Sequence, residues 1–189
     1  MAAPGTYTAS LVKQIGDKIE TLSEPQAFEV KPLRKGALEG ASPEEVANFW
    51  REYEAAVRMH SAMNIALQNA LKKAGRMTEV LANASAEVGD MDQRLGKLRE
   101  KLSAIDAVMN GSKAKREVGE KYKAVIMDRL FTVSRGVDRS TYGATPLHRQ
   151  SLEIANDLIS DSHESLSGAM NELSELAAEL VESLSLIHI

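Results

Sequence analysis

The chain has 189 residues and a net charge of −4 at pH 7, and 43% of its residues are hydrophobic while 26% are charged. This composition is typical of a globular chain of one or two domains and argues against global disorder. Because the sequence contains no cysteine, a disulfide framework, a thiolate nucleophile and a cysteine-ligated zinc site are excluded.

The sequence predicts no membrane span and no export signal. No uninterrupted apolar run approaches the roughly 18 residues that a membrane span needs. Met1 to Gly5 has neither the basic region nor the apolar stretch of a signal peptide. We therefore expect that nothing in these residues exports the chain.

Charge is distributed unevenly along the chain. Residues 111–149 carry nine Lys or Arg against four Asp or Glu, whereas residues 150–189 carry eight acidic residues and no Lys or Arg. We interpret the two segments as neighbouring helices whose surface charges complement one another. A nucleic-acid patch beside a solubilising tail is the alternative.

The first part of the chain has the pattern of β-strands. Residues 6–12 are rich in Thr, Tyr and β-branched residues, and Gly16 then begins a two-residue turn into a return strand at 18–21. A further strand is predicted at 26–30. Because an isolated hairpin is marginally stable in water, we interpret residues 1–31 as the last strands of a truncated β-sandwich. A hairpin folded onto the helices is the alternative.

A linker and a sharp helix start follow the strands. Residues 32–41 contain proline and two glycines and are predicted to be a linker. Ser42 then supplies an N-cap, Pro43 the first helical position and Glu45 the second half of a capping box.

Apolar residues recur every seven positions from Ser42 to Met109, in two rows offset by three. This spacing places both rows on one stripe of a helix, which must be buried against other helices. The first row is Val46, Tyr53, His60, Leu67, Ala74, Leu81, Val88, Leu95, Leu102 and Met109. The second row is Phe49, Ala56, Met63, Ala70, Met77, Ala84, Met91, Leu98 and Ile105.

A helix break is predicted near residues 83–90, where Asn, Ser, Gly and Asp gather. A single helix to Met109 is the alternative, because the heptad phase continues through Val88. We favour the break, since a rod of about 100 Å would find too little partner length in the rest of the chain. The second helix, about 86–109, should stop at Asn110 and Gly111.

Two more helices are predicted, at about 116–134 and about 146–183, the latter capped by Thr145 and opened by Pro146. The inward residues of the first are Val118, Tyr122, Val125, Ile126, Leu130 and Val133. Those of the second are Ile154, Leu158, Ala169, Leu173, Leu176 and Leu180.

The predicted fold class is mainly α. Because short connections make consecutive helices antiparallel, residues 42–183 should form an up-down bundle of four helices, preceded by a short β-hairpin remnant of a β-sandwich. Residues 184–189 break the apolar pattern, and we interpret them as a non-native tail. The chain is accordingly expected to be a fragment truncated at both ends.

Catalytic, cofactor and metal sites are not predicted. None of His60, His148, His163 and His188 lies in an HExxH or Glu-x-x-His motif, and no glycine-rich phosphate loop is present. His60 is expected to be a satisfied core or core-edge histidine.

One local run stands out as a possible interaction loop. Arg135, Asp138, Arg139 and Tyr142 gather charged and aromatic side chains between two predicted helices, and binding residues often lie in such loops. A structured corner, with Tyr142 packed on helix ends, is the alternative.

Residues Pro4 to Thr8, Phe28 to Val30, Leu95 to Ile105 and Leu130 to Pro146 resemble the C-terminal region of a family of large exported bacterial proteins. These proteins have sortilin-like, sialidase-type (bacterial neuraminidase repeat) β-propellers and are often labelled glycosyl hydrolase. The resemblance implies an exported parent, periplasmic or extracellular, whose ligand site lies in a propeller outside this chain. It therefore implies no catalytic residue here.

The sequence leaves more than one function open. We expect a non-catalytic accessory bundle that packs on its parent's propeller and sandwich domains or on another protein, without cofactor, nucleic acid or small molecule. An independent cytosolic bundle that binds nucleic acid or a partner helix through residues 111–149 is the alternative. A bundle with a catalytic metal is a third hypothesis, disfavoured by the ligand spacings.

Overall fold

The computed structural model describes residues 2–32, 39–84, 88–137 and 142–185. The strands in these ranges are β1 (Gly5–Ala9), β2 (Val12–Ile15), β3 (Lys18–Thr21) and β4 (Gln26–Val30). The helices are α1 (Pro43–Ala82), α2 (Met91–Asn110), α3 (Lys113–Glu117), α4 (Ile126–Val137) and α5 (Pro146–Ser185). The fold is mainly helical with a small β part, as predicted.

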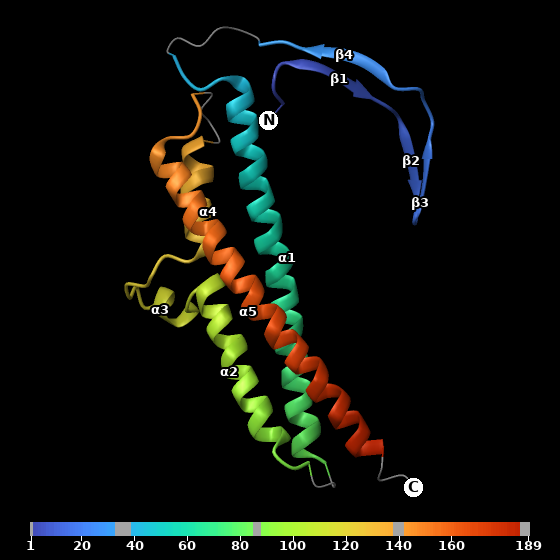
Figure 1. Ribbon diagram of the computed structural model, residues 1–189, viewed down its shortest axis with the longest axis vertical. Coiled ribbons are helices and arrows are strands. Elements are labelled where there is room, and N and C mark those ends of the chain that lie inside the picture. The colour runs from blue at the N-terminus through green and yellow to red at the C-terminus, as the bar shows by residue number, and fades with distance from the viewer. Residues whose placement is uncertain (1, 33–38, 85–87, 138–141, 186–189) are drawn as a thin grey trace.

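The helices form a bundle in which α2 and α4 share one position. α1 and α5, with 40 residues each and therefore about 60 Å long, run in the same direction side by side (Figure 1). α2 and then α4 run in the opposite direction beside them, and each packs against both long helices. A cross-section of the bundle through α2 or through α4 therefore contains three helices.

The predicted up-down alternation of four helices is wrong between α2 and α4, which run the same way. The prediction assumed a short connection, but residues 111–125 separate these two helices. A connection of this length lets α4 continue upward where α2 stopped. Gly111 ends α2 with a φ of +74°, a left-handed conformation that favours glycine.

The predicted third helix also begins later than expected. Gly119, at φ +69°, follows the short α3, and regular helix resumes only at Ile126. Val118 is consequently 76% exposed, and Tyr122 is exposed too, although both were predicted to face inward. The later residues of that pattern are buried as predicted: Val125, Ile126, Leu130 and Val133.

The heptad prediction is confirmed. Every member of the two apolar rows is buried or half-buried, and most of them meet the inward side of α5 in one continuous core. The favoured helix break is also confirmed, because α1 ends at Ala82 and α2 begins at Met91. α5 continues to Ser185, two residues beyond its predicted end, and Leu184 packs on the core; residues 186–189 lie outside the described ranges.

Predicted caps hold the starts of the two long helices. The Ser42 hydroxyl accepts from the Glu45 amide at 3.2 Å, and the Glu45 carboxylate accepts from the Ser42 amide at 2.8 Å. The Thr145 hydroxyl accepts from the His148 amide at 3.4 Å, and His148 Nδ1 accepts from the Thr145 amide at 3.2 Å. Each pair satisfies amides that the helix itself leaves without partners.

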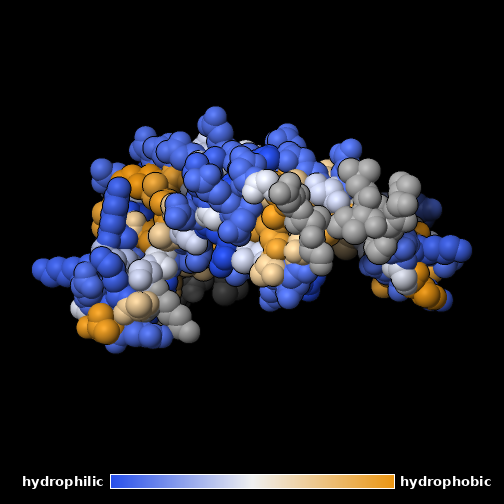
Figure 2. Space-filling model, turned by 90° about the horizontal axis from the view of Figure 1, so that it is seen from below, coloured by the Kyte–Doolittle hydropathy of each residue, from blue (hydrophilic) through white to orange (hydrophobic). Residues whose placement is uncertain are grey.

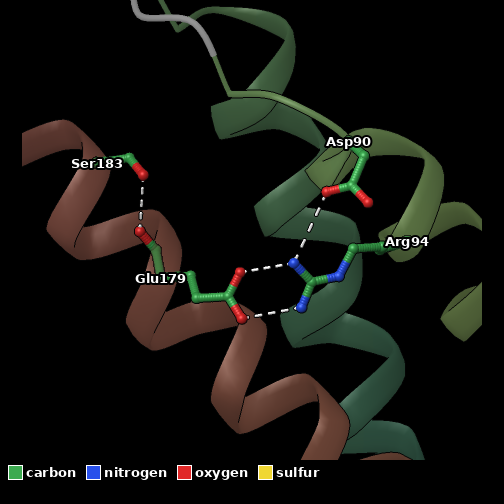
Figure 3. A network of polar contacts seen from close by, with 4 residues as sticks. All are labelled: Asp90, Arg94, Glu179 and Ser183. Atoms are coloured by element: carbon green, nitrogen blue, oxygen red, sulfur yellow. Dashed lines mark hydrogen bonds and ion pairs between the residues drawn. The ribbon is translucent and has the colours of Figure 1, made fainter.

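An exposed ion pair connects α2 to α5 (Figure 3). Arg94 donates to both carboxylate oxygens of Glu179, at 2.6 and 2.9 Å, and lies 3.8 Å from Asp90. The hydrogen bond to Glu179 raises the pKa of the Arg94 guanidinium, and the same bond lowers the pKa of the Glu179 carboxyl. The pair lies on the side of α5 that faces α2.

The strands form one bent, two-stranded ribbon. β1 pairs with β4 and β2 with β3, both antiparallel, and the predicted turn at Gly16 and Asp17 joins Ile15 to Lys18. Between the two ladders, residues 10–11 lie opposite residues 22–25, so the returning side of the ribbon has two extra residues there. The Leu22 amide donates to the Leu11 carbonyl at 2.8 Å and keeps the ribbon continuous.

The ribbon projects away from the bundle (Figure 1), and no described strand packs against a helix. Its large apolar side chains are about half exposed or more: Leu11, Val12, Ile15, Ile19, Leu22 and Phe28. Seen from below, the molecule is mostly hydrophilic, with separate hydrophobic patches that include one at the right, where the ribbon lies (Figure 2).

Candidate functional site

Tyr142, the last residue of the predicted interaction loop, packs against the residues just before α1. The Ala41 amide donates to the Tyr142 carbonyl at 3.0 Å. A side chain at Gly40 would approach the Tyr142 Cα to 2.9 Å, so only glycine fits that position. Asp138 and Arg139 lie outside the described residues.

Arg135 and Tyr142 contact different elements. The guanidinium of Arg135 lies 4.2 Å from the centre of the Phe131 ring on the same helix, a cation–π distance. Tyr142 belongs instead to the contact with the linker. The described half of the loop therefore resembles the structured corner more than an open binding loop, and its role in binding stays a prediction.

His148 is a structural residue that the sequence argument missed. Besides capping α5, its ring lies against Gly136 near the end of α4, where an added Cβ would overlap the imidazole. The signal was present in Thr145-Pro-Leu-His148, because His148 stands at the third helical position, where the second member of a capping box belongs.

The basic segment is engaged in local contacts. Lys115 pairs with Glu120 at 3.1 Å. Arg116 donates to the Asn110 carbonyl, and its guanidinium lies 5.9 Å from the Tyr122 ring centre. Lys115 and Arg116 thus stabilise the connection between α2 and α4. Their charged groups are therefore less available to nucleic-acid phosphates than the sequence suggested.

A polar cleft of about 640 Å³ lies where α2 ends beside α1. The Asn110 side-chain amide bridges the cleft, donating to Asn64 Oδ1 at 2.9 Å and to Asp106 Oδ1 at 2.7 Å. The lining residues are Asn64, Gln68, Asp106, Asn110, Gly111, Arg116 and Glu117. This set offers hydrogen-bonding groups, one guanidinium and the two carboxylates of Asp106 and Glu117.

A second hollow, of about 400 Å³, is lined only by α1 and α5. Its walls are mostly apolar or small, with Ile65 and Met170 at the rim and Ala70 and Leu173 at the floor. Such a surface has the character of a helix-packing groove rather than of a reaction centre.

His60 is buried in the core, at 5% exposure, as predicted. Its Nδ1, however, has no hydrogen-bond partner among the described residues, so the expectation of a satisfied histidine is not met. Burial lowers the pKa of the His60 imidazole, which keeps the ring neutral. A buried nitrogen without a hydrogen-bond partner lowers the stability of the fold.

Within the described ranges, no group of three or more His, Asp or Glu is placed to hold a metal ion. No helix in the described part of the chain is long and apolar enough to cross a membrane. Comparisons with known protein families, with curated proteins and with solved structures find no match to this chain.

Proposed function

We propose that this chain is a non-catalytic accessory region of a larger protein, in which a helical bundle serves packing and protein interaction. The parent is a sortilin-like or glycosyl-hydrolase-labelled β-propeller protein at the bacterial periphery. In this proposal the ribbon supplies the last strands of a β-sandwich and the bundle spaces or docks the neighbouring domains.

The exposed ribbon is the observation that carries the proposal. Within the part of the chain that the structure describes, each strand has one hydrogen-bonded neighbour, so both outer edges of the ribbon are unpaired there. Leu11 and Ile15 are 62% and 66% exposed, and Ile19 is 68% exposed. Free edges and exposed apolar side chains are what a strand pair presents when its remaining sheet is absent.

Energetics support the need for a partner. Fully burying a large aliphatic side chain contributes about 1.5–3 kcal/mol, and six large apolar side chains of the ribbon are half exposed or nearly so. Packing them under a second sheet therefore offers several kcal/mol. The bundle, by contrast, already buries its own apolar stripes in one core.

Hydrogen exchange of the full chain tests the argument. The buried amides of α1, α2 and α5 should be protected, whereas the amides of β1 to β4 should exchange nearly as fast as an unfolded peptide, because the ribbon lacks a covering layer. Strong protection of the ribbon in the isolated chain would contradict the proposal.

The encoding DNA and an activity assay test the larger claim. A reading frame that continues upstream of Met1 into propeller repeats supports an accessory region. A stop codon directly upstream contradicts it. Turnover of aryl glycosides by the purified chain would overturn the non-catalytic assignment.

A further inference from the structure

Three helices at each level leave one side of the α1–α5 pair uncovered. The hollow between them is lined by the small residues Ala62 and Ala66 on α1 and by Ser174 on α5. Ile65, at 65% exposure, and Met170, at 39%, stand at its edges. Small residues between bulky ones let another helix approach to the usual 8–10 Å.

The two helices that form this face carry opposite charge. Residues 55–78 of α1 include Arg58, Lys72, Lys73 and Arg76 and no acidic residue. α5 carries eight acidic residues against a single basic residue, Arg149, in its first turn. A surface of this kind has a positive half and a negative half, and it is complementary to itself after a twofold rotation.

Acidic residues of α5 that face α2 already have partners. Glu172 pairs with Lys101 at 2.8 Å, and Glu179 pairs with Arg94 at 2.6 Å (Figure 3). Pairing with a basic neighbouring helix is thus what this helix does inside the bundle.

Several other charged residues of α1 and α5 have no such partner. Lys72 and Arg76 on α1, and Glu164, Glu175 and Glu182 on α5, form no ion pair with any described residue. The three acidic residues are spaced by 11 and 7 and therefore share one face of α5. Arg58, Ile65 and Lys72 are spaced by seven and likewise share one face of α1.

We propose that the open face of α1 and α5 binds a second copy of this chain in a parallel twofold dimer. The twofold axis runs along the bundle, so α1 of each copy lies over α5 of the other. The competing arrangement, with the axis across the bundle, places α1 on α1 and α5 on α5. That arrangement brings like charges together, which disfavours it.

The heights of the charges fit the parallel arrangement. Ala66 of α1 and Met170 of α5 line the same hollow, and Arg149 of α5 lies over the Phe49 ring of α1. The two helices therefore run in the same direction. A residue of α5 lies at the same height as the residue of α1 whose number is about 100–104 lower. Lys72 of one copy therefore meets the level of Glu175 in the other. Arg76 falls between the levels of Glu175 and Glu182.

The available area is sufficient for a stable dimer. The face is about 60 Å long and about two helix diameters wide, which is on the order of 1,000 Å² for each copy. Stable interfaces bury about 800 Å² on each partner.

Sedimentation and light scattering of the full chain test the proposal. We expect a dimer whose dissociation constant rises with salt, and at least about a 10-fold weaker dimer for K72E/K73E/R76E. The matched control K97E/K121E/K123E reverses three exposed cations elsewhere and should leave the dimer unchanged. A monomeric wild-type chain, or a dimer that K72E/K73E/R76E does not weaken, overturns the proposal.

A heterodimer and engineered cysteines test the geometry. K72E/K73E/R76E and E164K/E175K/E182K should each be monomeric and should pair when mixed; failure to pair contradicts the interface. If the triple variant does not fold, as circular dichroism would show, K72E alone takes its place.

Because the chain has no natural cysteine, N69C mixed with S174C should form an interchain disulfide, while each single variant should not. An N69C dimer linked to itself would refute the parallel arrangement.

Discussion

His60 offers the sharpest test of how the core is packed. The side chain is 5% exposed, and its Nδ1 is buried without a hydrogen-bond partner in the described part of the chain. A buried polar atom left without a partner costs about 1–3 kcal/mol. We expect His60→Leu to raise the free energy of unfolding by about 1 kcal/mol near neutral pH, because leucine fills a similar space without that cost.

His60 should also make the stability of the wild-type chain depend on pH. Burial lowers the pKa of the folded-state imidazole below the ordinary value of 6.5. In the window below 6.5 the unfolded chain therefore binds a proton that the folded chain does not. The free energy of unfolding should fall there as the pH drops toward the folded-state pKa, by up to about 1.4 kcal/mol per pH unit. Above that window His60 adds no pH dependence to the free energy of unfolding.

Urea denaturation followed by circular dichroism, at several pH values between about 5 and about 8, measures the effect. His60→Leu should lose the extra acid sensitivity, so its advantage over the wild-type chain should grow as the pH falls. His163→Gln, which removes an exposed histidine of α5, is the control and should follow the wild-type chain. Protein concentration is held constant, because self-association would also shift stability. Parallel pH profiles for His60→Leu and the wild-type chain would refute the reasoning.

Other substitutions probe the bundle through the same denaturation assay. Leu102→Ala, at a side chain with no exposed surface, should lower the free energy of unfolding by about 2–5 kcal/mol. Val118→Ala, at an exposed side chain, should change it by less than about 0.5 kcal/mol. Equal losses for the two variants would contradict the corrected boundaries of α3 and α4. Gly136→Ala should cost about 1–3 kcal/mol because its methyl group overlaps the His148 ring, and adding His148→Ala should recover part of that loss. Ser42→Ala should cost about 1 kcal/mol by removing the capping box of α1, with Ser42→Asp expected to retain most of it.

The candidate site was only partly accessible from the sequence. The run from Arg135 to Tyr142 was recognisable as a polar loop, but its packing on Gly40 and Ala41 brings together residues about a hundred positions apart. The complementary charges of residues 55–78 and of α5 can be counted in the sequence. That the two helices lie side by side, with one side uncovered, depends on how α2 and α4 fill the third position.

Short-range patterns by themselves determined α1, α2 and α5. Seven-residue spacing selected the buried stripe from Val46 to Met109, and Ser42 and Thr145 marked two helix starts, because periodicity and capping act within one or two turns. Tertiary structure alone decided that α4 continues in the direction of α2 and that Val118 and Tyr122 face solvent. Those outcomes depend on which surfaces meet across a long connection, and contacts between distant segments leave no periodic trace in the sequence.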